Sequence, residues 1–89
     1  MKKETFKVAT HIAWRRVEEE IVALDLDSSL YYSFNDTGAR IWELLAEGAP
    51  LEKTVVSVAE EFEAAPAVIE KDAREFVRDL RKEKLLEPA

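Results

Sequence analysis

Hydrophobic residues follow two different periods along this chain, and the change falls at Phe34. From Thr10 to Phe34, apolar residues alternate with polar or small ones, as in the strands of a half-buried sheet. Acidic and serine residues interrupt the alternation at positions 18–19 and 27–29, at hairpin spacing. The pattern predicts three antiparallel strands joined by two hairpins. Their register is left open, because neither turn contains the glycine of the commonest short hairpins.

After Phe34 the apolar spacing becomes helical, and three helices are predicted. A side-chain oxygen from Asn35, Asp36 or Thr37 can cap the first helix, and Gly48 can end it. Pro50 and Pro66 each suit the first position of a following helix. The predicted apolar stripes are Ile41, Trp42, Leu44 and Leu45 in the first helix, Leu51, Val55, Val58, Ala59 and Phe62 in the second, and Ile69, Ala73, Phe76, Val77 and Leu80 in the third.

Strands followed by helices predict an α+β domain, in which the helices cover one face of a three-stranded antiparallel sheet. The order is that of a winged helix-turn-helix-like fold with its hairpins at the front. A chain of 89 residues is expected to form a single domain, 1–89, with an ordered core over about residues 10–87.

Composition narrows the possible partners. The 13 basic and 19 acidic residues give a formal net charge of −6, which disfavours a nucleic acid as partner. The chain has no cysteine, as is usual in a reducing cytoplasm, and no apolar run long enough for a membrane span or signal peptide. We therefore expect a cytoplasmic protein with no membrane partner.

The residues needed for catalysis or metal binding are missing from the sequence. His11 is the single histidine, and no cysteine or second histidine could complete a metal site with it. Gly38 and Gly48 are the only glycines, so there is no phosphate-binding glycine loop. The acidic clusters have the spacing of solvated turn and helix surfaces. We expect no enzyme activity, no metal and no cofactor.

The third predicted strand is a candidate binding edge. Three strands in consecutive order leave the first and third as edges, whose unpaired backbone groups can pair with another chain. Arg15 and Arg16 discourage such pairing on the first, whereas residues 30–34 contain neither charge nor proline. This favours addition of a peptide strand there. Alternatively, the two tyrosines simply pack on the core or on the back of the sheet. In the first case Leu30, Tyr32 and Phe34 would share one face, and Tyr31 and Ser33 the other.

Several motifs together identify a family resemblance. They are the Asp27-x-x-x-x-Tyr32 spacing, the helix start Asn35-x-Thr37-Gly38-Ala39, the stripe Ile41-Trp42-x-Leu44-Leu45 and the pattern Asp72-x-x-x-Phe76-x-x-x-Leu80. With them, residues 10–87 resemble the PqqD-like family, also called RiPP recognition elements. Ser29 departs from the family pattern, since many relatives have glycine before the aromatic strand.

The resemblance implies a winged helix-turn-helix-like fold that binds the leader segment of a ribosomally synthesised precursor peptide. The leader would add as a strand along the third strand, in a groove completed by the third helix. A separate enzyme, such as a leader protease or a radical-SAM enzyme, would then modify the presented peptide. The tyrosine-bearing strand is more similar to standalone lasso-peptide members than to those of PQQ biosynthesis. The implied peptide contacts are Leu30, Tyr31, Tyr32, Ser33, Phe34, Asp72, Phe76, Val77 and Leu80.

Two other functions are compatible with the predicted fold. In a DNA-binding winged helix, the third helix would enter the major groove. However, the six basic and five acidic residues between 66 and 84 interleave at spacings typical of intrahelical pairing, so no cationic face is predicted. Alternatively, the open edge could pair with itself. The leader-binding reading predicts a monomer or weak dimer, and a size measurement separates it from a self-paired module.

Overall fold

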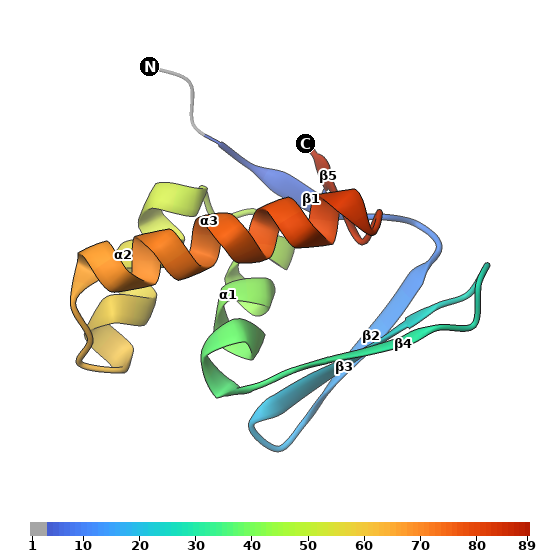
Figure 1. Ribbon diagram of the computed structural model, residues 1–89, viewed down its shortest axis with the longest axis horizontal. Helices are drawn as coiled ribbons and strands as arrows, with labels where there is room; N and C mark the ends of the chain where they lie inside the picture. Colours follow the sequence, from blue (N-terminus) through green and yellow to red (C-terminus); the bar gives the residue numbers. More distant parts are fainter. Residues whose placement is uncertain (1–3) are drawn as a thin grey trace.

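The computed structural model describes residues 4–89 and confirms the predicted α+β architecture, with two further strands at the ends of the chain (Figure 1). The three-stranded sheet lies beside a layer of three helices, and α3 crosses above α1 in this view. The elements are β1 (Phe6–Val8), β2 (Ile12–Val17), β3 (Glu20–Asp25), β4 (Tyr31–Phe34), α1 (Asp36–Ala46), α2 (Leu51–Glu61), α3 (Pro66–Lys82) and β5 (Leu86–Pro88).

The main sheet has the order β2-β3-β4, antiparallel throughout, as predicted. Residues 18–19 form the two-residue turn between β2 and β3, where Glu18 adopts the left-handed conformation with φ of 58°. Ala23 is the centre of the sheet, because it lies opposite Trp14 on one side and Tyr32 on the other. This register leaves β4 at one edge.

A bulge connects β3 to β4. The N–H of Ser29 donates to the carbonyl of Asp25 at 2.8 Å, and the N–H of Asp25 donates to the carbonyl of Leu30 at 2.9 Å. Two residues thus oppose one, and the first of them, Ser29, has φ of 65°, which is the arrangement of a G1 bulge. Glycine normally occupies that position of a G1 bulge, so Ser29 adopts a backbone conformation that favours glycine.

The Asp25 side chain holds the same turn. Its Oδ1 accepts hydrogen bonds from the backbone N–H groups of Asp27 at 2.9 Å and Ser28 at 3.1 Å. These bonds stabilise the carboxylate and so lower the pKa of Asp25 below its ordinary value. The bond from Ser28 makes the largest contribution. A largely buried carboxylate therefore fixes the point at which β4 begins.

The helix boundaries follow from local chemistry. Of the three possible caps for α1, Asn35 is the one used, and its Oδ1 accepts from the N–H of Gly38 at 3.1 Å. Gly48 follows α1 with φ of 98°, as predicted. Pro66 is the first residue of α3, as predicted. Pro50 is the N-cap of α2 and not its first residue, so this helix begins one residue later than predicted. Among residues 4–89, no helix combines the length and apolarity that crossing a bilayer requires.

The core lies between one face of the sheet and the helices. Ile21, Ala23 and Phe34 point from the sheet into this layer. Trp42 of α1 is fully buried, and its ring lies 5.2 Å from that of Phe34 and 5.9 Å from that of Trp14. The apolar stripes are largely confirmed, except that Phe62 ends up at the C-cap of α2 and remains 36% exposed.

A second, two-stranded sheet was not predicted. β1 pairs antiparallel with β5, and the two strands bury Phe6 and Leu86. The N–H of Leu51 donates to the carbonyl of Glu4 at 2.8 Å, which ties the start of α2 to the same segment. The ordered part of the chain therefore begins well before residue 10, where the predicted core started.

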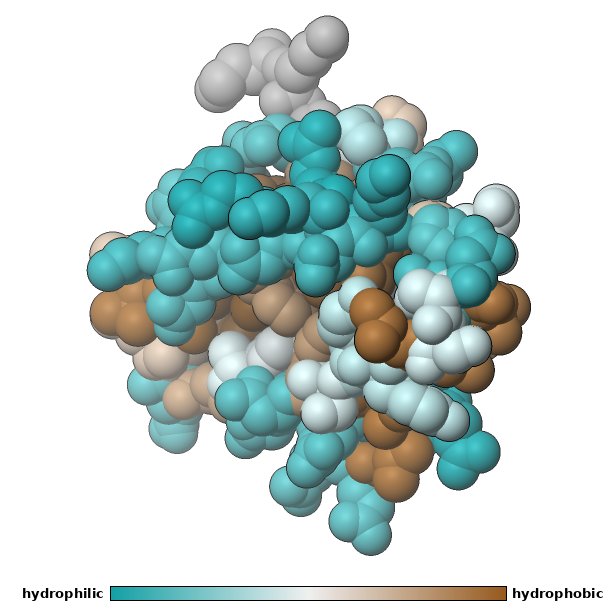
Figure 2. Space-filling view, turned by 45° about the vertical axis from the view of Figure 1, so that its right-hand side comes forward, coloured by the Kyte–Doolittle hydropathy of each residue, from teal (hydrophilic) through white to brown (hydrophobic). Residues whose placement is uncertain are grey.

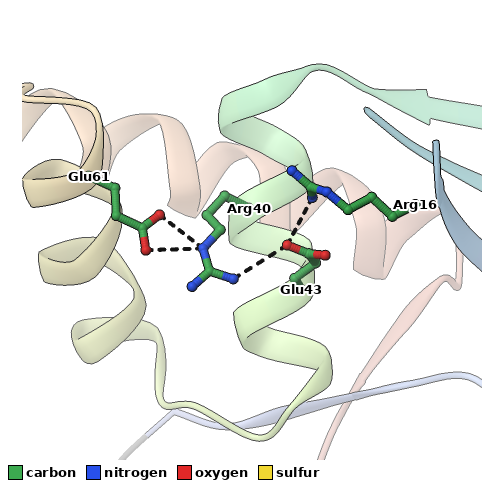
Figure 3. Close-up of polar contacts among 4 residues, drawn as sticks. All are labelled: Arg16, Arg40, Glu43 and Glu61. Atoms are coloured by element: carbon green, nitrogen blue, oxygen red, sulfur yellow. Dashed lines mark hydrogen bonds and ion pairs between the residues drawn. The ribbon is translucent and has the colours of Figure 1, made fainter. Parts of the chain in front are cut away.

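Ion pairs join the sheet to two helices (Figure 3). Arg40 of α1 donates from Nε to both carboxylate oxygens of Glu61 in α2, at 3.1 and 2.9 Å. Glu43 of α1 lies 2.9 Å from a guanidinium nitrogen of Arg16 in β2 and 3.4 Å from one of Arg40. Arg16, which was predicted to discourage strand pairing at the β2 edge, thus also links the sheet to α1 through an ion pair.

Candidate peptide-binding edge and groove

The outer edge of β4 is open along its whole length. β4 pairs only with β3, and within residues 4–89 no other segment hydrogen bonds to its outer side. In an antiparallel pair, residues alternate between bonding to the neighbour and pointing away from it. Because Leu30 bonds to Asp25, Tyr32 and Phe34 also bond to β3, and the backbone groups of Tyr31 and Ser33 point outward. These two residues therefore offer two N–H donors and two carbonyl acceptors to an added strand.

The two neighbouring tyrosines have different surroundings. Tyr31 is 73% exposed on the side of the sheet away from the helices, whereas Tyr32 packs against the core. The pKa of Tyr32 is raised by partial burial and, secondarily, by the negative charges of Glu83 and Asp25. Leu30 precedes β4 and is 57% exposed, so it does not share the packed position of Tyr32 and Phe34 as predicted.

A groove lies between the start of α1 and the middle of α3. Its wall on α3 includes the half-buried Phe76, whose ring stands edge-on to Phe34 at 5.1 Å. A Cβ at Gly38 would stand 3.7 Å from the Phe76 ring, so the absent side chain keeps this part of the groove wide. In Figure 2, hydrophobic and weakly polar surface lies below the hydrophilic surface of α3. The cavity of about 330 Å³ is lined by Asn35, Thr37, Gly38, Ile41, Ile69, Asp72 and Phe76.

The structure divides the four α3 residues that the resemblance assigned to peptide contact. Asp72 and Phe76 line the groove. Val77 and Leu80 are 5% and 4% exposed, belong to the core and are not among the residues that line this groove, so their contact with a peptide stays a prediction. The reason for their burial is helical rotation, since positions one and four after Phe76 turn by about 100° and 40° toward the buried side. The sequence analysis did not assign peptide contacts to the start of α1, which it interpreted as a helix cap and as part of a family motif.

The charges of α3 are largely segregated around the helix, although Glu70 lies on the basic side, where it pairs with Arg74. Asp72, Asp79 and Glu83 lie within about 60° of Phe76 around the helix, whereas the basic residues lie about 120° or more away. Within residues 4–89, Glu70–Arg74 is the only ion pair inside α3. We call Asp72, Asp79 and Glu83 the acidic flank, and Lys71, Arg74, Arg78, Arg81 and Lys82 the basic flank.

The two flanks border different cavities. The acidic flank meets the groove at Asp72 and continues at Asp79 and Glu83, which line a smaller cavity together with Lys82. The basic flank borders a cavity of about 560 Å³ on the other side of α3, lined by Glu4, Phe6, Leu51, Arg74, Val77, Arg78, Arg81 and Lys82. A cationic face therefore does exist, but away from β4.

One group in the described part of the chain has the donor types of a metal site. Single ligand atoms from His11, Asp25 and Asp27 lie within 4.8 Å of one another. The Oδ1 of Asp25 already accepts two backbone hydrogen bonds in the β3–β4 turn, and its Oδ2 lies 3.8 Å from Nε2 of His11. The turn accounts for this grouping, so it is structural in our interpretation.

Comparison with known proteins identifies the family. The family model of coenzyme PQQ synthesis protein D (PqqD) matches residues 20–86, which include the whole edge strand and all three helices. The chain belongs to the PqqD family. None of the curated proteins compared with it is detectably similar.

Two solved structures resemble this PqqD-family chain over nearly their whole length. The first is described as TbiB1 in complex with the TbiA(beta) leader peptide, with a TM-score of 0.85 and 32% identity over 91% of this chain and 94% of that one. The second is lasso peptide synthetase B1 complexed with the leader peptide, with a TM-score of 0.84 and 25% identity over 93% and 98%. Neither is a DNA-binding protein by description, so the DNA-binding alternative gains no support.

Proposed function

We propose that this protein is a non-catalytic recognition element that binds the leader segment of a ribosomally synthesised precursor peptide. The observation that carries the proposal is the uncovered edge of β4 beside the groove formed by α1 and α3. Two similar structures are described as leader-peptide complexes, which supports the same kind of ligand here. Tyr31 is exposed on one face of the sheet and Tyr32 packs against the core on the other, an arrangement that leaves the edge between them free for an added strand.

The bound leader would extend the sheet by one strand. Its backbone would pair with the outward-facing N–H and carbonyl groups of Tyr31 and Ser33, which supply affinity irrespective of side chains. Alternate leader side chains would enter the groove against Phe76 and Ile41, so bulky apolar residues are favoured there. Phe34 and Trp42 support the floor through ring packing and need not move.

Binding serves a second enzyme in this proposal. A leader held on β4 leaves the remainder of the precursor accessible, and a leader protease or radical-SAM enzyme that docks nearby meets it at high effective concentration. The close similarity to the B1 protein of a lasso peptide synthetase favours a lasso-type pathway. Catalysis would lie entirely in the partner.

Isothermal titration with the leader encoded by the adjacent precursor gene tests the proposal. We expect micromolar or submicromolar affinity, about −8 kcal/mol, with one peptide per chain. The TbiA(beta) leader peptide is a useful second probe because it is the ligand in a structure 32% identical to this chain. Absence of heat and of any spectral shift with the adjacent-gene leader at tens of micromolar would reject leader binding.

Ser33→Pro tests the strand-addition geometry, with Ser33→Ala as its matched control. Proline removes the outward N–H and places a ring at the edge, whereas alanine removes only the exposed hydroxyl. We expect about tenfold weaker binding for Ser33→Pro, near 1.4 kcal/mol, and less than twofold change for Ser33→Ala. Circular dichroism should show both variants folded. Equal affinities of the two variants would show that the leader binds elsewhere.

A further inference from the structure

The acidic flank of α3 is placed beside the proposed leader-binding groove. Asp72 lines the groove itself, and Asp79 and Glu83 continue the same side of the helix toward its C-terminal end. All three side chains belong to exposed residues, and within residues 4–89 none of them forms an ion pair. One carboxylate thus lines the groove, and two more follow it along the same side of α3, none of them in an ion pair within the described part of the chain.

The opposite wall of the groove does not compensate this charge. β4 contains no ionisable group except the two tyrosines, and the groove residues of α1 are neutral. Lys82 lines a cavity with Asp79 and Glu83 but does not line the groove at Asp72. After partial burial, the charge of Glu83 also contributes to the raised pKa of Tyr32 in β4.

The positions of Asp79 and Glu83 are unfavourable for α3 itself. They occupy the last turn and the C-cap of the helix, where the aligned peptide dipoles already carry partial negative charge. Basic residues are favoured at such positions, and the basic flank follows that preference with Arg81 and Lys82. The negative charges of Asp79 and Glu83 are therefore unfavourable at this helix end. A cation bound beside them would offset this unfavourable interaction.

We propose that the acidic flank selects leader peptides that carry lysine or arginine beside the segment that pairs with β4. This inference rests on the proposed function and adds the chemistry of its ligand. Leader side chains that leave the added strand toward α3 reach Asp72, Asp79 and Glu83, and a cation there forms pairs that the free protein lacks. Such rim charges chiefly accelerate association and discriminate against acidic peptides.

The test compares two triple variants with the same change in net charge. The groove variant is Asp72→Asn/Asp79→Asn/Glu83→Gln, and the control is Glu47→Gln/Glu52→Gln/Glu60→Gln, three exposed residues at the end of α1 and on α2 without ion pairs in the described part of the chain. The probe is the leader that binds wild-type protein in the titration above, together with a version in which its lysines and arginines are glutamine.

We expect the groove variant to bind the leader about tenfold more weakly at low salt and the control variant to change less than twofold. The loss should shrink at high ionic strength, where exposed charges are screened. The glutamine peptide should bind wild type about tenfold more weakly and should not distinguish wild type from the groove variant, as a double-mutant cycle requires for a direct pair.

The outcomes separate the inference from the proposed function. If the groove variant binds the native leader as tightly as wild type does, the acidic flank does not select its ligand, and leader binding itself still stands. If groove and control variants lose affinity equally, the effect is one of overall charge and the inference is rejected. If wild type binds neither peptide, the proposed function fails and the inference fails with it.

Discussion

At the scale of single residues, Ser29 shows how a departure from a family pattern can be accommodated. Its φ of 65° is costly for a residue with a Cβ, by roughly 1 to 2 kcal/mol, and cheap for glycine. The neighbouring Ser28 supports the turn, because its Oγ accepts from the N–H of Leu30 at 3.3 Å. Ser29 keeps the bulge because Asp25 binds the turn from the other side.

Ser29→Gly is therefore expected to stabilise the protein. Relief of the left-handed conformation is offset in part by the greater entropy of glycine in the unfolded chain, which leaves a gain of about 0.5 to 1 kcal/mol. Urea unfolding measures it. Ser28→Gly is the control and should destabilise, since it removes an acceptor and has no left-handed backbone to relieve. A loss of stability in Ser29→Gly would contradict the account of the bulge.

At the scale of elements, the sequence predicts those that have a strong period or a distinctive boundary. The end at Gly48 and the start at Pro66 each depend on one residue with a specific backbone role, and both were predicted, whereas Asn35 was one of three candidate caps. β1 and β5 have three residues each, too few for an alternation to be visible. Their pairing joins the two ends of the chain, and no local pattern records such a contact.

The groove was predicted only in part for a similar reason. The open edge at β4 follows from strand order and composition, so it could be found in the sequence. Which side of α3 faces it depends on helix rotation relative to the sheet, and that is set by packing of Phe76 on Phe34. Val77 and Leu80 therefore lie in the core, outside the lining of the groove. The charge separation could have been found by placing Asp72, Asp79 and Glu83 on a helical wheel with Phe76.

Phe6→Ala tests the unpredicted β1–β5 sheet. Phe6 is 6% exposed, and truncation of a buried phenylalanine costs about 3 to 5 kcal/mol. We expect a loss near the lower end, because the site lies beside a cavity into which neighbours can relax. Thermal unfolding measures it, with Val68→Ala, a 56% exposed position, as a control that should change little. A loss below 1 kcal/mol would show that this sheet contributes little to stability.

At the scale of the whole molecule, paired and unpaired charges lie on different surfaces. Ion pairs among Arg16, Arg40, Glu43 and Glu61 hold the sheet to α1 and α2, away from the groove (Figure 3). The acidic flank meets the groove at Asp72 and continues at Asp79 and Glu83, and most of the basic flank lies on the other side of α3. A net charge of −6 is thus compatible with two surfaces of opposite sign on one helix.

This distribution bears on whether the open edge pairs with itself. Two copies joined along β4 would form a continuous sheet about a two-fold axis, and symmetry would bring both acidic flanks to the same interface. Like charges that face each other are repulsive, and an edge of four residues provides few hydrogen bonds to overcome this. The protein alone should therefore remain a monomer of 10.2 kDa, and a leader should convert it into a one-to-one complex.

Size-exclusion chromatography with light scattering at about 100 μM protein measures this directly, with and without leader peptide. A dimer that dissociates when leader is added, and that Ser33→Pro also disrupts, would mean that the β4 edge pairs with itself until a peptide displaces the second copy. A dimer that neither leader nor Ser33→Pro affects would place the contact on another surface. A monomer in every sample except the complex is the expected result, and it would exclude self-pairing of the β4 edge at this concentration.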